Sequence, residues 1–208
     1  MNIIEKLNWR YATKRMNGTK VPQEKVENIL EAIRLAPTSL GLQGFKVFVI
    51  EDEALREEIF KGACQQPQIK EASHVLVFAA NKKVSAGQVD EYMQLIATTR
   101  GVSVDTLSGF RAAFDRIISG TEEQNFNWTA RQAYIAFGVG LTAAAMENVD
   151  ATPMEGFSAE AMDKILGLND QNLSAVTVLT LGYRDEANDY LVNAAKVRKS
   201  KENLFILK

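Results

Sequence analysis

The chain has 208 residues, of which 46% are hydrophobic and 24% are charged, and its formal net charge is −2. This composition is typical of a globular protein with a sizeable core and excludes an intrinsically disordered chain. A charge so close to zero generates no global field that would attract nucleic acid or an anionic membrane. Any anion binding therefore has to come from a local cluster of basic side chains.

One cysteine, Cys64, and one histidine, His74, limit the chemistry that side chains can supply. A single cysteine cannot form an intrachain disulfide, which suits a reducing compartment. These two residues do not suffice for a zinc site, so we expect no bound metal. We interpret Cys64 as a semi-buried structural residue and His74 as a structural residue at the start of a strand.

The first seven residues lack the basic region and apolar core of a signal peptide. No apolar run reaches the roughly 20 residues that a helix needs to span a bilayer. We therefore expect a soluble, cytoplasmic protein whose partners include neither a membrane nor nucleic acid.

Hydrophobic periodicity predicts four elements in the first half of the chain. A helix begins at Gln23, with apolar residues on one face at helical spacing, and ends before Pro37, since proline disfavours helix in the preceding residue. A strand follows over 45–50, then a helix over 53–63. The nearly all-apolar segment 74–80 predicts a buried strand.

The second half is predicted to be mainly helical. The segment 85–120 indicates two helices separated near Gly101, and 128–148 a central buried helix that is apolar almost all round. A short helix over 158–166, with Ser158 as its N-cap, precedes a strand over 174–182. About four strands among seven or eight helices favour an α+β layered fold.

The segment 188–208 is basic up to Lys201 and then turns apolar, ending in Leu204-Phe205-Ile206-Leu207-Lys208. An apolar terminal stretch usually docks onto something. Two interpretations stay open: the stretch packs onto its own sheet, or it adds a strand to the sheet edge of a partner.

Basic residues occur in pairs at both ends of the chain: Arg10 with Lys14, and Lys196 with Arg198. Phosphate binding needs charge-assisted donors of this kind, and arginine can bind phosphate with two hydrogen bonds. Each pair alone is equally consistent with a solvated surface.

Three loops carry groups suited to a flat heterocycle, although each is also an ordinary turn. The loop 38–44 has two hydroxyls, two glycines and an amide, and the loop 65–68 has three amides around a proline. The loop 153–157 contains Gly156, which permits close backbone approach. Neither a P-loop nor a Gly-x-Gly-x-x-Gly motif is present.

Taken in order, these segments resemble the nitroreductase family over about residues 3–200. Residues 10–14, Arg-Tyr-Ala-Thr-Lys, are similar to the family's Arg-x-Ser-x-Lys, and 36–45 to its Ala-Pro-Ser-Ser-x-Asn-x-Gln-Pro-Trp loop. Residues 65–74 resemble its Asn-Gln-Pro-Gln and Ala-Ser-His segment. Residues 155–157 match its Glu-Gly-Phe and 196–198 its Lys-x-Arg. The most similar branch comprises NAD(P)H-dependent, oxygen-insensitive nitroreductases that also reduce dihydropteridines and quinones.

The resemblance implies an FMN site. Within it, Arg10, Lys196 and Arg198 would bind the phosphate, and Lys14 would lie near the N1–C2 edge of the flavin, where negative charge develops on reduction. Gln65 would bind the pyrimidine edge, and Glu155 and Gly156 would present backbone amides to N5. The implied cofactor contacts are Arg10, Tyr11, Ala12, Lys14, Pro37, Thr38, Ser39, Gly41, Gln65, Gln68, Glu155, Gly156, Lys196 and Arg198; the implied substrate contacts are Leu40, Gln65 and Phe114.

The implied fold is α+β and nitroreductase-like, with a central, mainly antiparallel sheet flanked by helices in an intertwined homodimer. Residues 1–208 would form one domain in which 85–120 is a helical lid and 188–208 an extension reaching the partner subunit. Residues 37–39 would contact the partner's flavin.

The implied activity is hydride transfer from NAD(P)H to electron-poor small molecules such as nitroaromatics or quinones, by a ping-pong mechanism. No side chain needs to be catalytic, because the flavin carries the reaction. Three alternatives stay open: a flavin-binding protein of the same fold with low turnover, a different reductive reaction in that fold, and a flavin-free α+β binding protein.

Four departures from the family pattern bear on the site. Ala12 replaces a serine, Gly41 an asparagine, Gly44-Phe45 a Pro-Trp pair, and Gln68 a lysine near the flavin. Fewer cations at that edge should lower the reduction potential of the flavin.

Overall fold

A four-stranded antiparallel sheet forms the centre of the computed structural model, which describes residues 2–208. The strands are β1 (Phe45–Ile50), β2 (His74–Asn81), β3 (Asp150–Met154) and β4 (Leu173–Gly182), in the order β1-β2-β4-β3. Every neighbouring pair is antiparallel. The α+β class and the antiparallel sheet are thereby confirmed.

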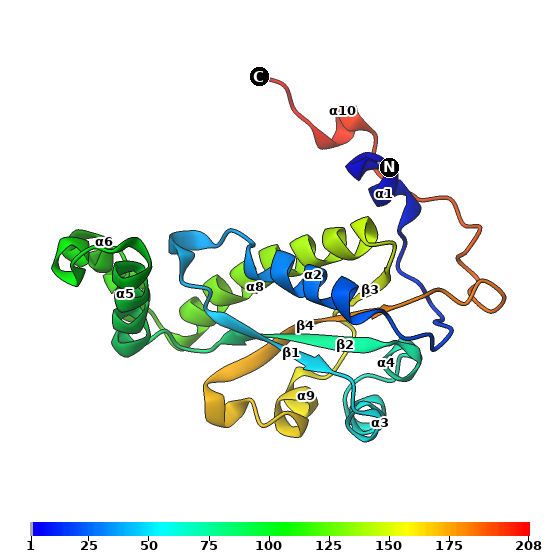
Figure 1. The fold of residues 1–208 in the computed structure, drawn as a ribbon, viewed down its shortest axis with the longest axis horizontal. Helices are drawn as coiled ribbons and strands as arrows, with labels where there is room; N and C mark the ends of the chain where they lie inside the picture. The colour runs from blue at the N-terminus through cyan, green and yellow to red at the C-terminus, as the bar shows by residue number, and fades with distance from the viewer. Residues whose placement is uncertain (1) are drawn as a thin grey trace.

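Helices cover both faces of the sheet (Figure 1). The helices α2 (Gln23–Arg34) and α8 (Glu122–Met146) pack on one face, and α3 (Glu53–Gly62), α4 (Gln68–Glu71) and α9 (Ala159–Ile165) lie on the other. Each face has its own hydrophobic core. All eight residues of β2 are buried between these layers, which explains the continuous apolar run that predicted this strand.

The prediction of strands over 45–50, 74–80 and 174–182 is confirmed, whereas β3 was not predicted from the sequence. Pro153 lies in the middle of β3 and pairs with Leu179. Proline removes a backbone donor, so it is tolerated only where one side of the strand needs no partner. The strand order makes β3 an edge strand and satisfies this condition.

The predicted helices from Gln23 to before Pro37, over 53–63 and over 158–166 are confirmed to within a residue or two, and Ser158 caps α9 by accepting a hydrogen bond from the Ala161 amide. The central helix begins at Glu122 rather than at Trp128. Thr121 and Gln124 form a capping box there that fixes the start. The short helix α1 (Ile3–Trp9), begun by a capping box of Asn2 and Glu5, was also not predicted.

The segment 85–120 is an excursion away from the sheet (Figure 1). Its first half is α5 (Ala86–Arg100), which ends at Gly101 in the left-handed conformation. The prediction of a single second helix was wrong. Short turns follow instead: η2 (Val104–Leu107), α6 (Ser108–Ala112) and α7 (Asp115–Ile118). A separate core forms beneath them around Val84, Val89, Met93, Ile96 and Phe114.

After β4 the chain crosses to the N-terminal end of the molecule, where the last helix, α10 (Lys201–Leu204), lies near α1 (Figure 1). Leu204, Phe205, Ile206 and Leu207 are between 60% and 96% exposed. Packing of this tail onto its own sheet is therefore wrong, and its reach to a partner stays a prediction. None of the described helices combines the length and apolarity that crossing a bilayer requires.

Candidate functional site

Basic residues from the two ends of the chain meet at one cavity. Arg10, Lys196 and Arg198 line a cavity of about 450 Å³ together with Tyr11 and Ala12. The Lys196 ammonium donates hydrogen bonds to the backbone carbonyls of Leu7 and Arg10, so the C-terminal segment is pinned against the end of α1. The structure thus brings together residues that are more than 180 positions apart in the chain.

The electrostatics of this cavity favour an anion. Burial, followed by repulsion from Arg198, lowers the pKa of Arg10, although Asp150 acts in the opposite direction. Burial, followed by repulsion from Arg10 and Arg198, also lowers the pKa of Lys196. No acidic side chain lines the cavity, and the buried Arg10 Nε has no hydrogen-bond partner in the described chain. A phosphate-like anion would satisfy this donor and relieve the repulsion.

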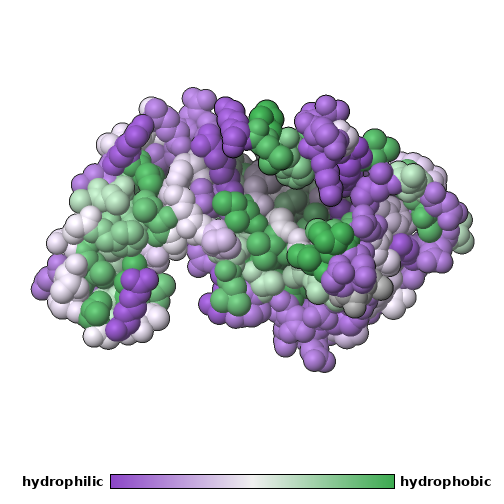
Figure 2. Space-filling view, turned by 90° about the horizontal axis from the view of Figure 1, so that it is seen from above, coloured by the Kyte–Doolittle hydropathy of each residue, from purple (hydrophilic) through white to green (hydrophobic). Residues whose placement is uncertain are grey.

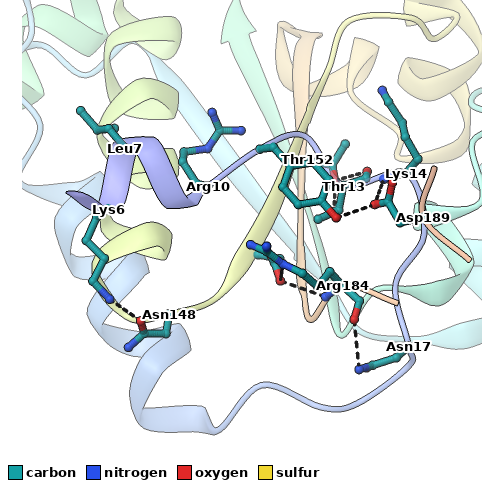
Figure 3. Close-up of polar contacts among 12 residues, drawn as sticks. Lys6, Leu7, Arg10, Thr13, Lys14, Asn17, Asn148, Thr152, Arg184 and Asp189 are labelled. Carbon is teal, nitrogen blue, oxygen red and sulfur yellow. Dashed lines mark hydrogen bonds and ion pairs between the residues drawn. The ribbon is translucent and has the colours of Figure 1, made fainter. Parts of the chain in front are cut away.

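Asp189 holds the basic N-terminal segment in place (Figure 3). Its Oδ2 accepts hydrogen bonds from the Tyr11 hydroxyl at 2.9 Å and from the Lys14 amide at 2.7 Å, and its Oδ1 accepts from the Leu191 amide at 2.8 Å. Burial opposes ionisation of Asp189, but these hydrogen bonds prevail and lower its pKa. Burial and the bond to Asp189 raise the pKa of Tyr11. The carboxylate therefore ties residues 11–14 to the segment that carries Lys196 and Arg198.

Arg184 packs against the rings of Trp9 and Tyr11, on either side of Arg10 in the sequence. Its guanidinium carbon lies 4.5 Å from the Trp9 ring centroid and 4.7 Å from that of Tyr11. The guanidinium also forms an ion pair of 2.6 Å with Asp150, which is 2% exposed and opens β3. Nothing in the local sequence distinguished Asp150, Arg184 or Asp189 from surface charges, and sequence reasoning missed all three.

Gln68 forms a buried hydrogen bond to the backbone of the segment 10–14. It is 1% exposed, and its amide nitrogen donates to the carbonyl of Thr13 at 2.8 Å. The Thr13 hydroxyl in turn lies 2.7 Å from that of Thr152 on β3. The Gln68 Oε1 is buried and has no hydrogen-bond partner among residues 2–208. Gln68 thus positions the backbone of residues 10–14, and its predicted direct contact with a cofactor stays a prediction. The Lys14 side chain extends away from Asp189 (Figure 3).

The loops around Gln65 and Gly156 lie side by side. The Ser158 amide donates to the Ala63 carbonyl at 2.9 Å, and a Cβ added to Gly156 would lie 3.4 Å from the Gln66 side-chain nitrogen. Gln65, Glu155 and Gly156 are all exposed. Two loops predicted to contact the same ring are therefore neighbours.

The side chain of Glu155 is held by Tyr134 of α8. The Tyr134 hydroxyl lies 2.7 Å from Glu155 Oε1 and donates to it, while burial and this hydrogen bond raise the pKa of Tyr134 to about 12. Tyr134 is a positioning residue that sequence reasoning missed.

The turn at residues 37–41 lies beside the excursion rather than at the cationic cavity. Leu40 and Gly41 have φ angles of 57° and 72°, and a Cβ on Gly41 would lie 2.2 Å from the Tyr92 hydroxyl oxygen. A side chain here would require the Tyr92 hydroxyl to shift and would hold a left-handed backbone, and both requirements favour glycine at position 41. The Ser39 amide donates to Gln132 Oε1 at 2.7 Å, while the buried Thr38 hydroxyl has no partner among residues 2–208. The expected contacts of Pro37, Thr38 and Ser39 with a partner's flavin, and of Gly41 with the cofactor, stay predictions.

Phe114 is fully buried within this chain, with edge-to-face contacts to Tyr92 and Phe110 at centroid distances of 6.2 and 5.6 Å. Its ring has no surface to offer to a substrate in this conformation. The neighbouring Phe110 is 37% exposed and is the aromatic side chain that reaches the surface there. Sequence reasoning did not single out Phe110.

Three comparisons with known proteins all match this chain to nitroreductases or flavin oxidoreductases. The family model described as the nitroreductase family matches residues 7–183. A Staphylococcus aureus protein named as an NAD(P)H nitroreductase is 33% identical over 198 residues, covering 88% of this chain and 87% of its own length. The major NAD(P)H-flavin oxidoreductase of Aliivibrio fischeri is 29% identical over 213 residues, covering 99% of this chain and 98% of its own.

Solved structures share the fold. A Bacillus subtilis protein described as a nitroreductase superposes with a TM-score of 0.83 at 21% identity, covering 99% of this chain and 98% of its own. An Exiguobacterium sibiricum protein, solved in complex with FMN, has a TM-score of 0.82 at 17% identity, covering 100% of this chain and 98% of its own. The fold and the paired basic ends define an α+β protein of the nitroreductase-like class. This chain belongs to the nitroreductase family.

Proposed function

We propose that this protein is an FMN-dependent oxidoreductase that transfers hydride from NAD(P)H to electron-poor acceptors, such as nitroaromatics or quinones. The observation that carries the proposal is the convergence of Arg10, Lys196 and Arg198 on one cavity, where the buried Arg10 Nε has no hydrogen-bond partner in the part of the chain that the structure describes. The names of the Staphylococcus aureus and Aliivibrio fischeri relatives support the enzyme class and its reductant.

The residues present fit FMN. The three cations can neutralise a phosphate dianion with one positive charge in excess, and the buried Arg10 Nε, which has no partner among residues 2–208, supplies a donor that needs an acceptor. Lys14 would lie near the N1–C2 edge, Gln65 at the pyrimidine edge, and the 155–156 backbone at N5. When bound, FMN supplies the two-electron chemistry of the reaction. The FMN complex of the Exiguobacterium sibiricum structure supports this cofactor.

The task of the protein side chains is then binding and orientation. Asp189 and Gln68 fix the backbone of residues 10–14, Arg184 packs against Tyr11, and Tyr134 orients Glu155. Reductant and acceptor occupy the same place in turn, which gives ping-pong kinetics. Within residues 2–208, no cluster of three or more His, Cys, Asp or Glu side chains is arranged to hold a metal ion.

The functional unit in this proposal is a cytoplasmic, intertwined homodimer, and residues 188–208 extend onto the partner subunit. Apolar side chains gather around a hollow on the face seen in Figure 2. Exposed apolar residues come from α1, from α8 and from the tail: Ile3, Ile4, Leu7, Ile135, Met146, Leu204, Phe205, Ile206 and Leu207. Burying this surface against a second copy would remove it from water.

The decisive test compares Arg198→Ala with Lys199→Ala. Both variants remove one positive charge, but only Arg198 lines the cavity. FMN affinity, measured by fluorescence titration of the apoprotein, should fall about 10-fold or more in Arg198→Ala, since a hydrogen bond between charged groups is worth about 1.5–3 kcal/mol. Equal FMN affinities in the two variants would contradict the phosphate assignment.

Turnover is tested separately in the wild-type protein. Rapid mixing with NADH or NADPH should bleach the flavin absorbance promptly, and a nitroaromatic or quinone should restore it. Double-reciprocal plots at several acceptor concentrations should be parallel. Bound FMN that bleaches only slowly would instead favour a flavin-binding protein with low turnover.

A further inference from the structure

A second cavity lies between the turn at residues 39–41 and the excursion. It measures about 390 Å³ and is lined by Leu40, Gly41, Tyr92, Arg100, Leu107 and Phe110. Pockets for small ligands usually measure about 300–1,000 Å³ and lie where separate elements meet. This cavity meets both conditions, because its walls come from the turn, from the end of α5 and from the short helices η2 and α6.

The wall of this cavity is mostly apolar and is held in one shape. Leu40 keeps a left-handed backbone, which is costly for a residue with a side chain, and Gly41 lies directly against the Tyr92 hydroxyl. On the opposite side, Phe110 packs edge-to-face on the buried Phe114. A turn held against an aromatic cluster presents a preformed surface that suits a flat, apolar ligand.

Arg100 is the only charged residue among those that line the cavity. Arg100 is an exposed residue, and within residues 2–208 its side chain makes no hydrogen bond or ion pair. By contrast, Arg111 of the same excursion is paired with both Asp90 and Asp115. The carboxylate of Asp105, in η2, accepts a hydrogen bond of 3.4 Å from the Ser103 hydroxyl. A guanidinium without a partner beside an apolar wall is suited to bind a carboxylate with two hydrogen bonds.

We propose that this cavity is an acceptor subsite for aromatic carboxylates, in which the apolar wall takes the ring and Arg100 takes the carboxylate. The inference rests on the proposed function, since residues 37–39, which lead into the Leu40–Gly41 turn, are expected to contact the partner's flavin in the homodimer proposed there. It deepens that function by naming a substrate class: anionic aromatic acceptors are preferred over neutral ones of the same shape.

The experiment compares two acceptors, 4-nitrobenzoate and its methyl ester, in the FMN-loaded protein. Arg100→Gln should raise the KM for 4-nitrobenzoate at least about 10-fold, since the loss of even one of the two charge-assisted hydrogen bonds has an effect of that size, and should leave the KM for the ester unchanged. The matched control is Arg116→Gln. Arg116 is an exposed arginine of the same excursion, but it lines a different cavity. Equal effects of Arg100→Gln on acid and ester, or no effect, would overturn the proposal.

A third variant tests the apolar wall. Phe110→Ala should raise the KM for 4-nitrobenzoate and for its ester by similar factors, because both present the same ring to the wall. A KM that stays unchanged for both acceptors would remove Phe110 from the subsite and contradict the assignment of the ring to this cavity.

A binding measurement separates this proposal from the proposed function. Titration calorimetry with 2-naphthoate and 2-naphthamide, which carry no nitro group, needs no turnover. Weaker naphthoate binding in Arg100→Gln, together with no reduction of any nitro acceptor, would support the subsite and contradict the oxidoreductase. Reduction of both nitro compounds, with naphthoate binding unchanged in Arg100→Gln, would support the oxidoreductase and overturn the subsite.

Discussion

The Tyr11 hydroxyl donates a hydrogen bond of 2.9 Å to Asp189, across 178 positions of sequence. The same carboxylate oxygen accepts the Lys14 amide. Asp189 stands shortly before Lys196 and Arg198 in the chain, and Tyr11 directly follows Arg10. This contact therefore sets the spacing between Arg10 on one side of the cavity and Lys196 and Arg198 on the other.

Replacing Tyr11 by phenylalanine should weaken this connection without changing the shape of the side chain. We expect the free energy of unfolding to fall by about 1–3 kcal/mol, because Asp189, 3% exposed, loses one of its donors. FMN affinity should fall as well, since Arg10 is held less firmly opposite Lys196. Urea unfolding and FMN titration measure the two effects. Tyr190→Phe, at a tyrosine that is 76% exposed, is the control and should change neither.

Removing Arg184 should be among the most destabilising single changes in the protein. Arg184→Met leaves Asp150 buried without its partner, which costs about 3–5 kcal/mol in comparable cases. The midpoint of urea unfolding should shift accordingly. As a comparison, Glu31→Gln breaks the exposed pair between Glu31 and Arg34 and should cost at most about 1 kcal/mol. Similar decreases in the free energy of unfolding in the two variants would show that the buried pair contributes no more to stability than the exposed one.

Stability should depend on pH through His74. This residue is 3% exposed, and its Nδ1 lies 2.8 Å from the Ser73 hydroxyl. Ser73 Oγ also accepts the Val21 amide, and His74 Nε2 is buried without a hydrogen-bond partner among residues 2–208. Burial lowers the pKa of His74 below its ordinary value of 6.5, although Glu51 opposes this.

The direction in which stability changes with pH follows from the difference in proton binding between the folded and the unfolded chain. The unfolded chain binds a proton at His74 more readily than the folded chain, so stability is fully present above pH 6.5 and is lost as the pH falls below it, towards the folded pKa. Urea unfolding at pH 7.5 and 5.5 should show this decrease in the wild type and a smaller one in His74→Gln. An equal decrease in both would assign the pH dependence to other groups.

Gly41→Ala should destabilise the turn at residues 39–41. Its φ of 72° costs an L-residue roughly 1–2 kcal/mol, and the added Cβ would meet the Tyr92 hydroxyl. The double variant with Tyr92→Phe should recover only the part due to the hydroxyl. Gly109→Ala, where nothing lies within 4 Å of the new Cβ, is the control and should be neutral or stabilising. Thermal unfolding would rank the three variants.

Elements with strong local patterns could be predicted from the sequence. The helix α2 shows apolar residues on one face, and β2 is apolar throughout because both of its faces are covered. The strand β3 escaped prediction because Pro153 is acceptable only at a sheet edge, and strand order is a tertiary property. The prediction of one helix for the second half of the excursion was wrong, because the helical spacing of its apolar residues is divided among turns too short to form one helix.

The sequence by itself determined the family, the α+β class and the two pairs of basic residues, because these reside in local patterns and in their order along the chain. Only the tertiary structure decided which of these cations share a cavity, and that Asp189, Arg184 and Asp150 hold them there. The physical reason is burial. In the local sequence, a carboxylate that is exposed on the surface cannot be told apart from one, such as Asp189, that connects the two ends of the chain. Only folding removes the second from water and supplies its donors.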